Sequence, residues 1–164
     1  MLSKYRQKRQ EGFTIIEVLI VLAIAGLILL VVFLAVPALQ RNSRNTQRSN
    51  DVAGLLGGMS EYVNNNNGSL PATQSGGAAG STNYVIGAAG SNTVDVSLGY
   101  FTGNNVSIVN VSGATHNNGT TQEQVQIVRS AKCNGGNATS TGASERGYVA
   151  LYTLENDSKQ CRES

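Results

Sequence analysis

The hydrophobic pattern of this 164-residue chain is dominated by one uninterrupted apolar run near its N-terminus. The run begins at Phe13, and residues 18–36 contain no charged side chain. A helix rises about 1.5 Å per residue, so a stretch of this length matches the hydrocarbon thickness of a bilayer. Residues 13–37 are therefore predicted to form a membrane-spanning helix.

After this run the pattern becomes amphipathic. Apolar residues recur at three- and four-residue spacing, which is typical of a helix with one buried face. They are Val52, Leu55, Leu56, Met59, Tyr62 and Val63. We expect residues 38–63 to continue the first helix, giving one helix over 14–63. Gly54, Gly57 and Gly58 weaken a helix relative to alanine, and close packing of a sheet against that face would explain them.

The helix is predicted to stop at an Asn-rich segment, after which the chain becomes β-rich. Residues 64–83 are rich in Asn, Gly, Ser and Thr and are predicted to form a loop. Short β-rich runs follow, several of them with alternating apolar residues, and they predict strands. These runs cover residues 84–86, 93–96, 106–111, 124–129 and 148–154. The expected fold is α+β, with the long helix packed on a small antiparallel sheet in a β-rich head at 84–164.

Positive charge is concentrated ahead of the apolar run. Within residues 1–12, two lysines and two arginines are opposed by Glu11 alone, whereas the rest of the chain is close to neutral. By the positive-inside rule, this leader predicts a cytoplasmic N-terminus and a head on the other side of the membrane. The near-neutral head carries no basic patch, so no specific nucleic-acid site is expected.

A single carboxylate, Glu17, lies inside the apolar run. An ionised carboxylate in a membrane helix is costly, and a simple anchor has no need of one. The spacing alone leaves two interpretations open. Glu17 extends toward the headgroups at the membrane interface, or it serves a contact that the segment makes with another molecule.

Cys133 and Cys161 are the two cysteines of the chain. An even number of cysteines behind an export signal predicts one disulfide in an oxidising compartment. The alternative is that both residues are unpaired and act as small apolar side chains. A disulfide between them would attach the C-terminal tail to the predicted sheet.

Little in the sequence points to catalysis. His116, the one histidine, lies in a Gly- and Asn-rich segment and is expected to be an exposed loop residue. The sequence contains no Cys/His cluster with metal-ligand spacing and no phosphate-binding glycine loop ahead of a helix. We therefore expect no catalytic residue, no metal and no cofactor, and the chain is not expected to be an enzyme.

The residues around Gly12 resemble the processing site of type IV prepilins. The resemblance rests on the basic leader, Gly12, the segment Phe13-Thr14-Ile15-Ile16-Glu17, and the apolar run that follows. It implies that prepilin peptidase removes residues 1–12 and that Phe13 is then N-methylated. It further implies that the apolar helices bundle in a filament, where Glu17 meets the Phe13 amine of a neighbouring subunit. Before assembly, the same two groups are expected on one helical face, four residues apart.

The sequence departs from the family pattern in its helix-breaking residues. Many bacterial pilins have a proline at the place of Leu34, whereas here the nearest one is Pro37. Gly26 stands where the family often has glycine, and in related filaments the helix between that glycine and the proline can melt. Because Pro37 removes an amide donor, we expect helix breaks at Gly26 and Pro37, with a kink or melted stretch near residues 35–37.

Three arginines follow the apolar run at helical spacing. Arg41, Arg44 and Arg48 are interpreted as a solvated face of the helix. The alternative is that they contact acidic residues of a neighbouring subunit, or lipid headgroups before extraction.

The resemblance implies a structural subunit of a type IV pilus, serving adhesion, twitching motility or DNA uptake. Its implied partners are further pilin subunits, prepilin peptidase and the pilus assembly platform. The precursor would reside in the inner membrane and the mature chain in an extracellular filament, with a C-terminal disulfide loop as in many type IV pilins. Two alternatives stay open: a minor pilin or type II secretion pseudopilin, and a monomeric signal-anchored surface binding protein.

Overall fold

The computed structural model describes residues 12–75, 81–88, 92–111 and 113–164. The chain divides into two compact units, Met1–Gln40 and Arg41–Ser164, and each is described by itself. Of the predicted leader, residues 1–11 lie outside the described residues. Residues 76–80 of the predicted loop at 64–83 lie outside them too.

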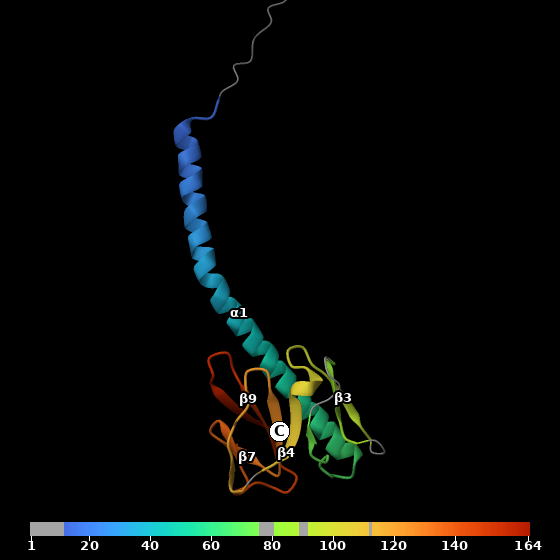
Figure 1. Ribbon diagram of the computed structural model, residues 1–164. Coiled ribbons are helices and arrows are strands. Elements are labelled where there is room, and N and C mark those ends of the chain that lie inside the picture. The colour runs from blue at the N-terminus through green and yellow to red at the C-terminus, as the bar shows by residue number, and fades with distance from the viewer. Residues whose placement is uncertain (1–11, 76–80, 89–91, 112) are drawn as a thin grey trace, which may run out of the picture. The chain divides into compact units, whose positions relative to one another are not determined.

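One long helix, α1 (Ile15–Asn65), confirms the helix predicted over residues 14–63 (Figure 1). It is helical without interruption through both Gly26 and Pro37. The melted stretch expected near residues 35–37 is therefore absent from this single chain. Pro37 removes one backbone hydrogen bond, but the residues on both sides of it remain helical. A break in a filament stays a prediction.

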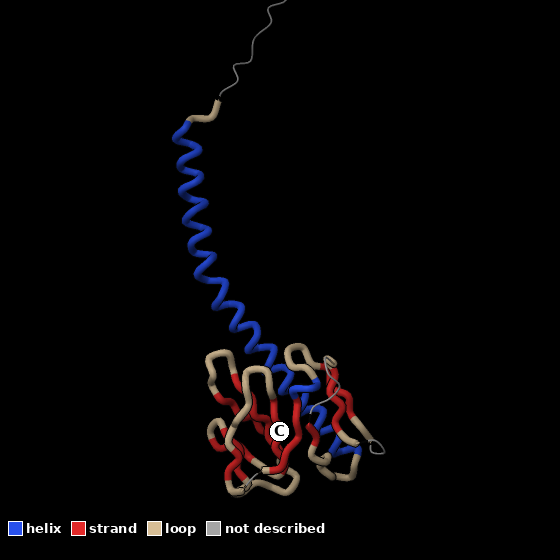
Figure 2. Tube along the Cα trace, viewed as in Figure 1, coloured by secondary structure: helices blue, strands red, loops and turns tan. Residues whose placement is uncertain are grey.

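The second unit combines the C-terminal part of α1 with short strands (Figure 2). A five-stranded sheet has the order β1-β4-β6-β9-β10, a hairpin pairs β2 with β3, and a small sheet has the order β5-β8-β7. The bounds are β1 (Gln74–Ser75), β2 (Asn83–Ile86), β3 (Val94–Ser97), β4 (Val106–Asn110), β5 (Thr115–His116), β6 (Val125–Arg129), β7 (Lys132–Asn134), β8 (Asn137–Thr139), β9 (Tyr148–Thr153) and β10 (Lys159–Glu163). A 3-10 turn, η1 (Gly103–Asn105), precedes β4. The layout is the predicted α+β arrangement of a long helix with small sheets.

The five predicted strands correspond to β2, β3, β4, β6 and β9, but their arrangement differs from one antiparallel sheet. Strand β4 pairs with β6 in parallel, with Ile108 opposite Ile127, whereas β6 pairs with β9 antiparallel. A parallel pair needs a crossover of about a dozen residues or more, and residues 111–124, which include β5, provide it. Alternation of apolar residues is the same for both pairings, so the sequence pattern does not distinguish them.

The core of the second unit lies between α1 and the sheets. Val52, Leu55 and Met59 on the helix are fully buried with Ile108 of β4 and Ile127 of β6. The hairpin β2–β3 borders the same part of α1 (Figure 1). This burial confirms the amphipathic pattern that begins at Val52.

Close packing explains only one of the three helical glycines. A Cβ on Gly58 would overlap the side chain of Val96 in β3. A Cβ on Gly54 would make ordinary contact with the same valine at 3.7 Å, and one on Gly57 would meet no atom within 4 Å. The fold of this chain therefore requires glycine at Gly58, and nothing in the structure explains Gly57.

The Asn-rich segment ends the helix through specific hydrogen bonds. Asn67 has a positive φ of 55°, and the N–H of Gly68 donates to the carbonyl of Val63 at 2.8 Å. This 6→1 bond is the Schellman pattern, in which the turn satisfies a free helix carbonyl. The side-chain amide of Asn66 also donates to the carbonyl of Asn92, which lies just before β3. The segment predicted as a plain loop thus fastens the helix end to the hairpin.

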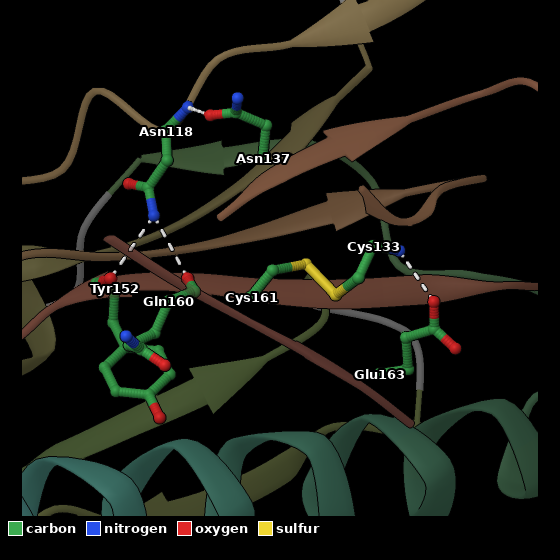
Figure 3. Close-up of a disulfide and its surroundings, with 7 residues drawn as sticks. All are labelled: Asn118, Cys133, Asn137, Tyr152, Gln160, Cys161 and Glu163. Carbon is green, nitrogen blue, oxygen red and sulfur yellow. Dashed lines mark hydrogen bonds between the residues drawn. A yellow bond between two sulfur atoms is a disulfide. The ribbon is translucent and has the colours of Figure 1, made fainter. Parts of the chain in front are cut away.

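The predicted disulfide is present and joins β7 to β10 (Figure 3). The Cα atoms of Cys133 and Cys161 are 5.7 Å apart. The C-terminal tail is a strand and not a free segment, because Cys161 also lies opposite Leu151 in the β9–β10 ladder. In Figure 3 the side-chain amide of Asn118 donates to the carbonyls of Tyr152 and Gln160, which adds a second tie between these strands.

Candidate processing and assembly site

The start of α1 is held by Thr14 and Glu17. The backbone N–H of Thr14 donates to Glu17 Oε2 at 2.8 Å, and the Thr14 hydroxyl donates to the same oxygen at 2.7 Å. In return, the backbone N–H of Glu17 donates to Thr14 Oγ1 at 3.4 Å. This is a capping box, in which an N-cap threonine and a glutamate three residues on satisfy each other's free amides. The sequence signal of a capping box is Thr-X-X-Glu ahead of an apolar run. The prediction for Glu17 considered only its charge and missed this signal.

Phe13 precedes the helix. The helix begins at Ile15, with Thr14 as its N-cap. In this uncleaved chain Phe13 and Glu17 therefore do not share a helical face, because the four-residue rule requires both residues inside a helix. The expected pairing concerns the amine that cleavage would create at Phe13, and it stays a prediction. Phe13 is 90% exposed, and a Cβ on Gly12 would meet no atom within 4 Å. Both residues of the Gly12–Phe13 bond are therefore exposed among the described residues.

The apolar half of α1 presents its side chains outward. Large hydrophobic residues from Phe13 to Leu39 are exposed on all faces of the helix, with Leu22, for example, 62% exposed. By length and composition this helix could cross a membrane, with a mean hydropathy of 3.4 over its most apolar window. Exposed apolar area of this extent marks a surface that contacts lipid or protein. The carboxylate of Glu17 lies within that surface, at its N-terminal end.

These features agree with a comparison against protein-family models. Residues 7–33 match the prokaryotic N-terminal methylation motif. The chain carries the type IV prepilin signature. The signature spans Gly12, Phe13, Glu17 and Gly26 and leaves the head outside it. No curated protein and no solved structure matches the chain.

The prepilin signature supports a type IV pilin-like or pseudopilin protein. The motif implies assembly into pilus filaments and processing by prepilin peptidase, and the proteins that carry it are structural rather than catalytic. Together with the apolar helix, it fits a membrane-anchored precursor. Cleavage after Gly12, methylation of Phe13 and the intersubunit contact of Glu17 stay predictions for this chain.

A second polar cluster, in the head, was not predicted from the sequence. The guanidinium of Arg44 donates from Nε and Nη2 to the two carboxylate oxygens of Glu155, at 2.6 and 2.8 Å. Arg48 is completely buried, stacks on the ring of Tyr100 at 4.3 Å and donates to its hydroxyl and to Glu155. The backbone N–H of Glu155 donates to Asn45 Oδ1 at 3.0 Å. The prediction of a solvated arginine face is therefore wrong for Arg48, which is buried. Arg44 pairs with Glu155 and still keeps 42% of its side chain exposed.

The ion pair between Arg44 and Glu155 shifts the pKa of both groups. The hydrogen bond from Arg44 lowers the pKa of Glu155, and the positive charges of Arg44, Arg48 and Arg41 act in the same direction. The same hydrogen bond raises the pKa of Arg44. Both groups are held in their charged forms, so the cluster attaches the helix to the turn between β9 and β10 near neutral pH.

Asp51 attaches α1 to another segment of the head. Its carboxylate accepts hydrogen bonds from the backbone N–H groups of Gly99, Tyr100 and Phe101, at 2.8, 2.7 and 2.9 Å. These three amides lie between β3 and η1, about fifty residues away in sequence. Such a buried carboxylate satisfies amides that would otherwise lack a partner. Asp51 is therefore a structural residue of the head.

His116 is not in a free loop. It lies in β5, is half-buried, and its Nε2 is 3.3 Å from Gln126 Oε1 on β6. The expectation of an exposed loop residue is wrong in this respect, because His116 pairs with Ala138 in the β5–β8 ladder. The contact with Gln126 ties the crossover between β4 and β6 to the sheet.

Proposed function

We propose that this chain is a structural subunit of a type IV pilus. Prepilin peptidase cleaves it after Gly12, Phe13 is N-methylated, and the mature chain polymerises through its apolar helix. The observation that carries the proposal is the outward-facing apolar half of α1 directly behind an accessible Gly12–Phe13 bond. An apolar surface on every face of a helix is covered by lipid in a precursor and by other helices in a bundle.

Glu17 sets the register of the bundle in this proposal. Cleavage creates an ammonium group at Phe13, and the carboxylate of Glu17 in a neighbouring subunit accepts a hydrogen bond from it. A helix shifted by one turn would leave both charges unpaired among apolar side chains, which is unfavourable. The pairing therefore selects one axial position of each subunit, even where its net contribution to stability is small.

The proposed topology follows from the charge distribution. The basic leader stays on the cytoplasmic side, and the head is exported, where the Cys133–Cys161 disulfide is stable. The pilus assembly platform then moves subunits from the inner membrane into an extracellular filament. The polar, weakly charged head would face water in that filament, which serves adhesion, twitching motility or DNA uptake.

A minor pilin or type II secretion pseudopilin is the second candidate, because the same N-terminal motif supports it. Abundance separates the two, since a major pilin is the main protein of sheared surface filaments. A monomeric signal-anchored binding protein is a third candidate, and it predicts an uncut leader without filaments.

Electron microscopy of sheared surface fibres, combined with quantification of their protein, tests the proposal. Cells producing the chain should carry fibres in which it is the main subunit, and cells lacking its gene should not. A matched strain producing Glu17→Ala should retain the protein in the membrane and yield few fibres. Fibres that are unchanged in the deletion strain would overturn the proposal, and a trace amount of the chain in them would favour the minor pilin.

A further inference from the structure

We propose that the arginines that follow the apolar run bind the phosphate of an anionic phospholipid while the precursor is in the membrane. The proposal rests on the proposed function for one point, a membrane-anchored precursor with its head exported. The arginines are Arg41, Arg44 and Arg48 of α1, and all three belong to the same compact unit as the head. They are three and four residues apart, so they share one side of the helix.

This arginine cluster carries more positive than negative charge. Among the described residues, Glu155 is the acidic partner of both Arg44 and Arg48. The hydrogen bond from Arg44 and the positive charges of all three arginines lower the pKa of this one carboxylate. Asp51, one turn beyond Arg48, is engaged by backbone amides instead. Two of the three positive charges are therefore left without a paired carboxylate.

Arg41 and Arg44 hold the free hydrogen-bond donors of the cluster. Arg41 is exposed and has no hydrogen bond or ion pair among the described residues. Arg44 uses Nε and Nη2 for Glu155, so its Nη1 is free within the described part of the chain. Glu155 also fixes the plane of this guanidinium, which lowers the entropy lost when a ligand binds. Guanidinium groups with free N–H donors are well suited to a phosphate.

The position of Arg41 along the helix matches the depth of phospholipid headgroups. A hydrocarbon core takes about 20 helical residues, and a count that starts at Glu17 ends at Pro37. Arg41 follows four residues later, which is about 6 Å along a helix. The headgroup layer on each side of a bilayer is about 5–7 Å deep. The long side chain of an arginine can reach a phosphate from such a position.

An open hollow on the adjoining side of α1 has room for the rest of a headgroup. It has a volume of about 420 Å³, and its lining includes Asn42, Asn45, Thr46, Ser49 and Tyr152. Amide and hydroxyl groups of this kind can bond to the hydroxyls of a glycerol headgroup. A quaternary ammonium headgroup would instead bring a second positive charge beside the arginines. The arrangement therefore favours phosphatidylglycerol over phosphatidylcholine.

Native mass spectrometry of the full chain in detergent tests the proposal. Phosphatidylglycerol and phosphatidylcholine with identical acyl chains are added in equal amounts, and the ratio of the two one-lipid adducts is measured. Because the basic leader also attracts anionic lipid, every chain compared has the four lysines and arginines of the leader replaced by glutamine. Phosphatidylglycerol should be preferred, and Arg41→Gln should lower the ratio about fivefold, the effect of one cationic side chain near an anionic membrane surface.

Lys132→Gln is the matched control, because it removes one exposed positive charge from β7. It should leave the adduct ratio unchanged, and circular dichroism should show that both variants are folded. An unchanged ratio in Arg41→Gln would overturn the proposal. An equal fall in the two variants would overturn it too, because binding would then depend on net charge and not on the arginine cluster.

Fibre yield in cells separates this proposal from the proposed function. If Arg41→Gln lowers the adduct ratio while cells producing the unmodified chain carry no fibres of it, the lipid site stands and the pilus assignment is wrong. If the ratio is unchanged and cells producing Arg41→Gln lose their fibres, Arg41 contacts an acidic residue of a neighbouring subunit, and the lipid site is wrong.

Discussion

The two halves of α1 are equally helical, but they are stabilised in different ways. In the N-terminal half, Leu22 is 62% exposed and its apolar neighbours face outward on all sides. In the C-terminal half, Leu55 is completely buried, and Arg48 and Asp51 bond to segments far away in sequence. Among the residues that the structure describes, tertiary contacts therefore support the second half alone, and the first half presents a surface for lipid or for other subunits.

One continuous helix can therefore contain two halves that are stabilised separately, one by the head and one by its surroundings. The C-terminal half folds with the head, because its apolar face and its polar contacts are satisfied within the same chain. The N-terminal half satisfies its backbone bonds internally, as a membrane helix must, and leaves its side chains free. Substitutions in the two halves should consequently affect different measurements.

The largest contrast is expected from leucine substitutions in the two halves. Leu55→Ala removes a fully buried side chain and should lower the free energy of unfolding of the head by about 4 kcal/mol, because it leaves a cavity. Leu22→Ala is the matched control and should change that free energy by less than about 0.5 kcal/mol. Denaturant unfolding of the full chain in detergent, followed by near-ultraviolet circular dichroism, measures both. Equal destabilisation by the two variants would break the distinction between the halves.

Removal of the disulfide should have the next largest effect. Cys133 and Cys161 are 28 residues apart in sequence, and opening a loop of this size lowers the free energy of unfolding by about 3.5 kcal/mol. The double variant Cys133→Ser/Cys161→Ser should show this loss in the same unfolding assay, and a reductant should reproduce it in the wild type. Membrane insertion of the apolar half should be unchanged. A double variant that is as stable as the wild type would show that β10 is held by its ladder alone.

A smaller effect is expected from Asp51. Asp51→Ala deprives three backbone amides of their acceptor and should lower the free energy of unfolding by about 2 kcal/mol. Asp51→Asn retains one acceptor oxygen and should lose less. Hydrogen exchange at Gly99, Tyr100 and Phe101 should accelerate in both variants. Unchanged exchange at these amides would contradict the role assigned to Asp51.

The smallest effect concerns pH. The Arg44 hydrogen bond lowers the pKa of Glu155 below its ordinary value of 4.5. The Arg44–Glu155 pair therefore contributes its full stabilisation at pH values above 4.5. This contribution is lost as the pH falls through the lowered pKa of Glu155. Unfolding midpoints measured from pH 7 to about pH 3 should decline more steeply in the wild type than in Glu155→Gln. Parallel pH profiles would show that the pair contributes nothing.

The sequence predicted the parts of the fold that depend on local patterns. The apolar run, the spacing from Val52 onward, the alternation in β4 and β6 and the short β-rich run of β9 were sufficient to place these elements. Strand β10 was missed because its residues, Lys-Gln-Cys-Arg-Glu, lack a buried apolar face. The parallel pairing of β4 with β6 depends on the crossover between them, which alternation does not encode.

The residues of the candidate site were likewise predictable only where a local sequence motif contains them. Gly12, Phe13 and Glu17 are adjacent in sequence, so a local motif was enough to find them. Thr14 was equally local, and its capping role was visible in the Thr-X-X-Glu spacing. The contacts of Arg48 with Tyr100 and Glu155 join segments 52 and 107 residues apart, and no local pattern predicts them.

Mass spectrometry of the intact subunit from purified surface filaments tests the central claim most directly. The account predicts a chain that begins at Phe13, carries one methyl group on its N-terminal nitrogen and retains the Cys133–Cys161 disulfide. A filament subunit that still begins at Met1 would contradict it.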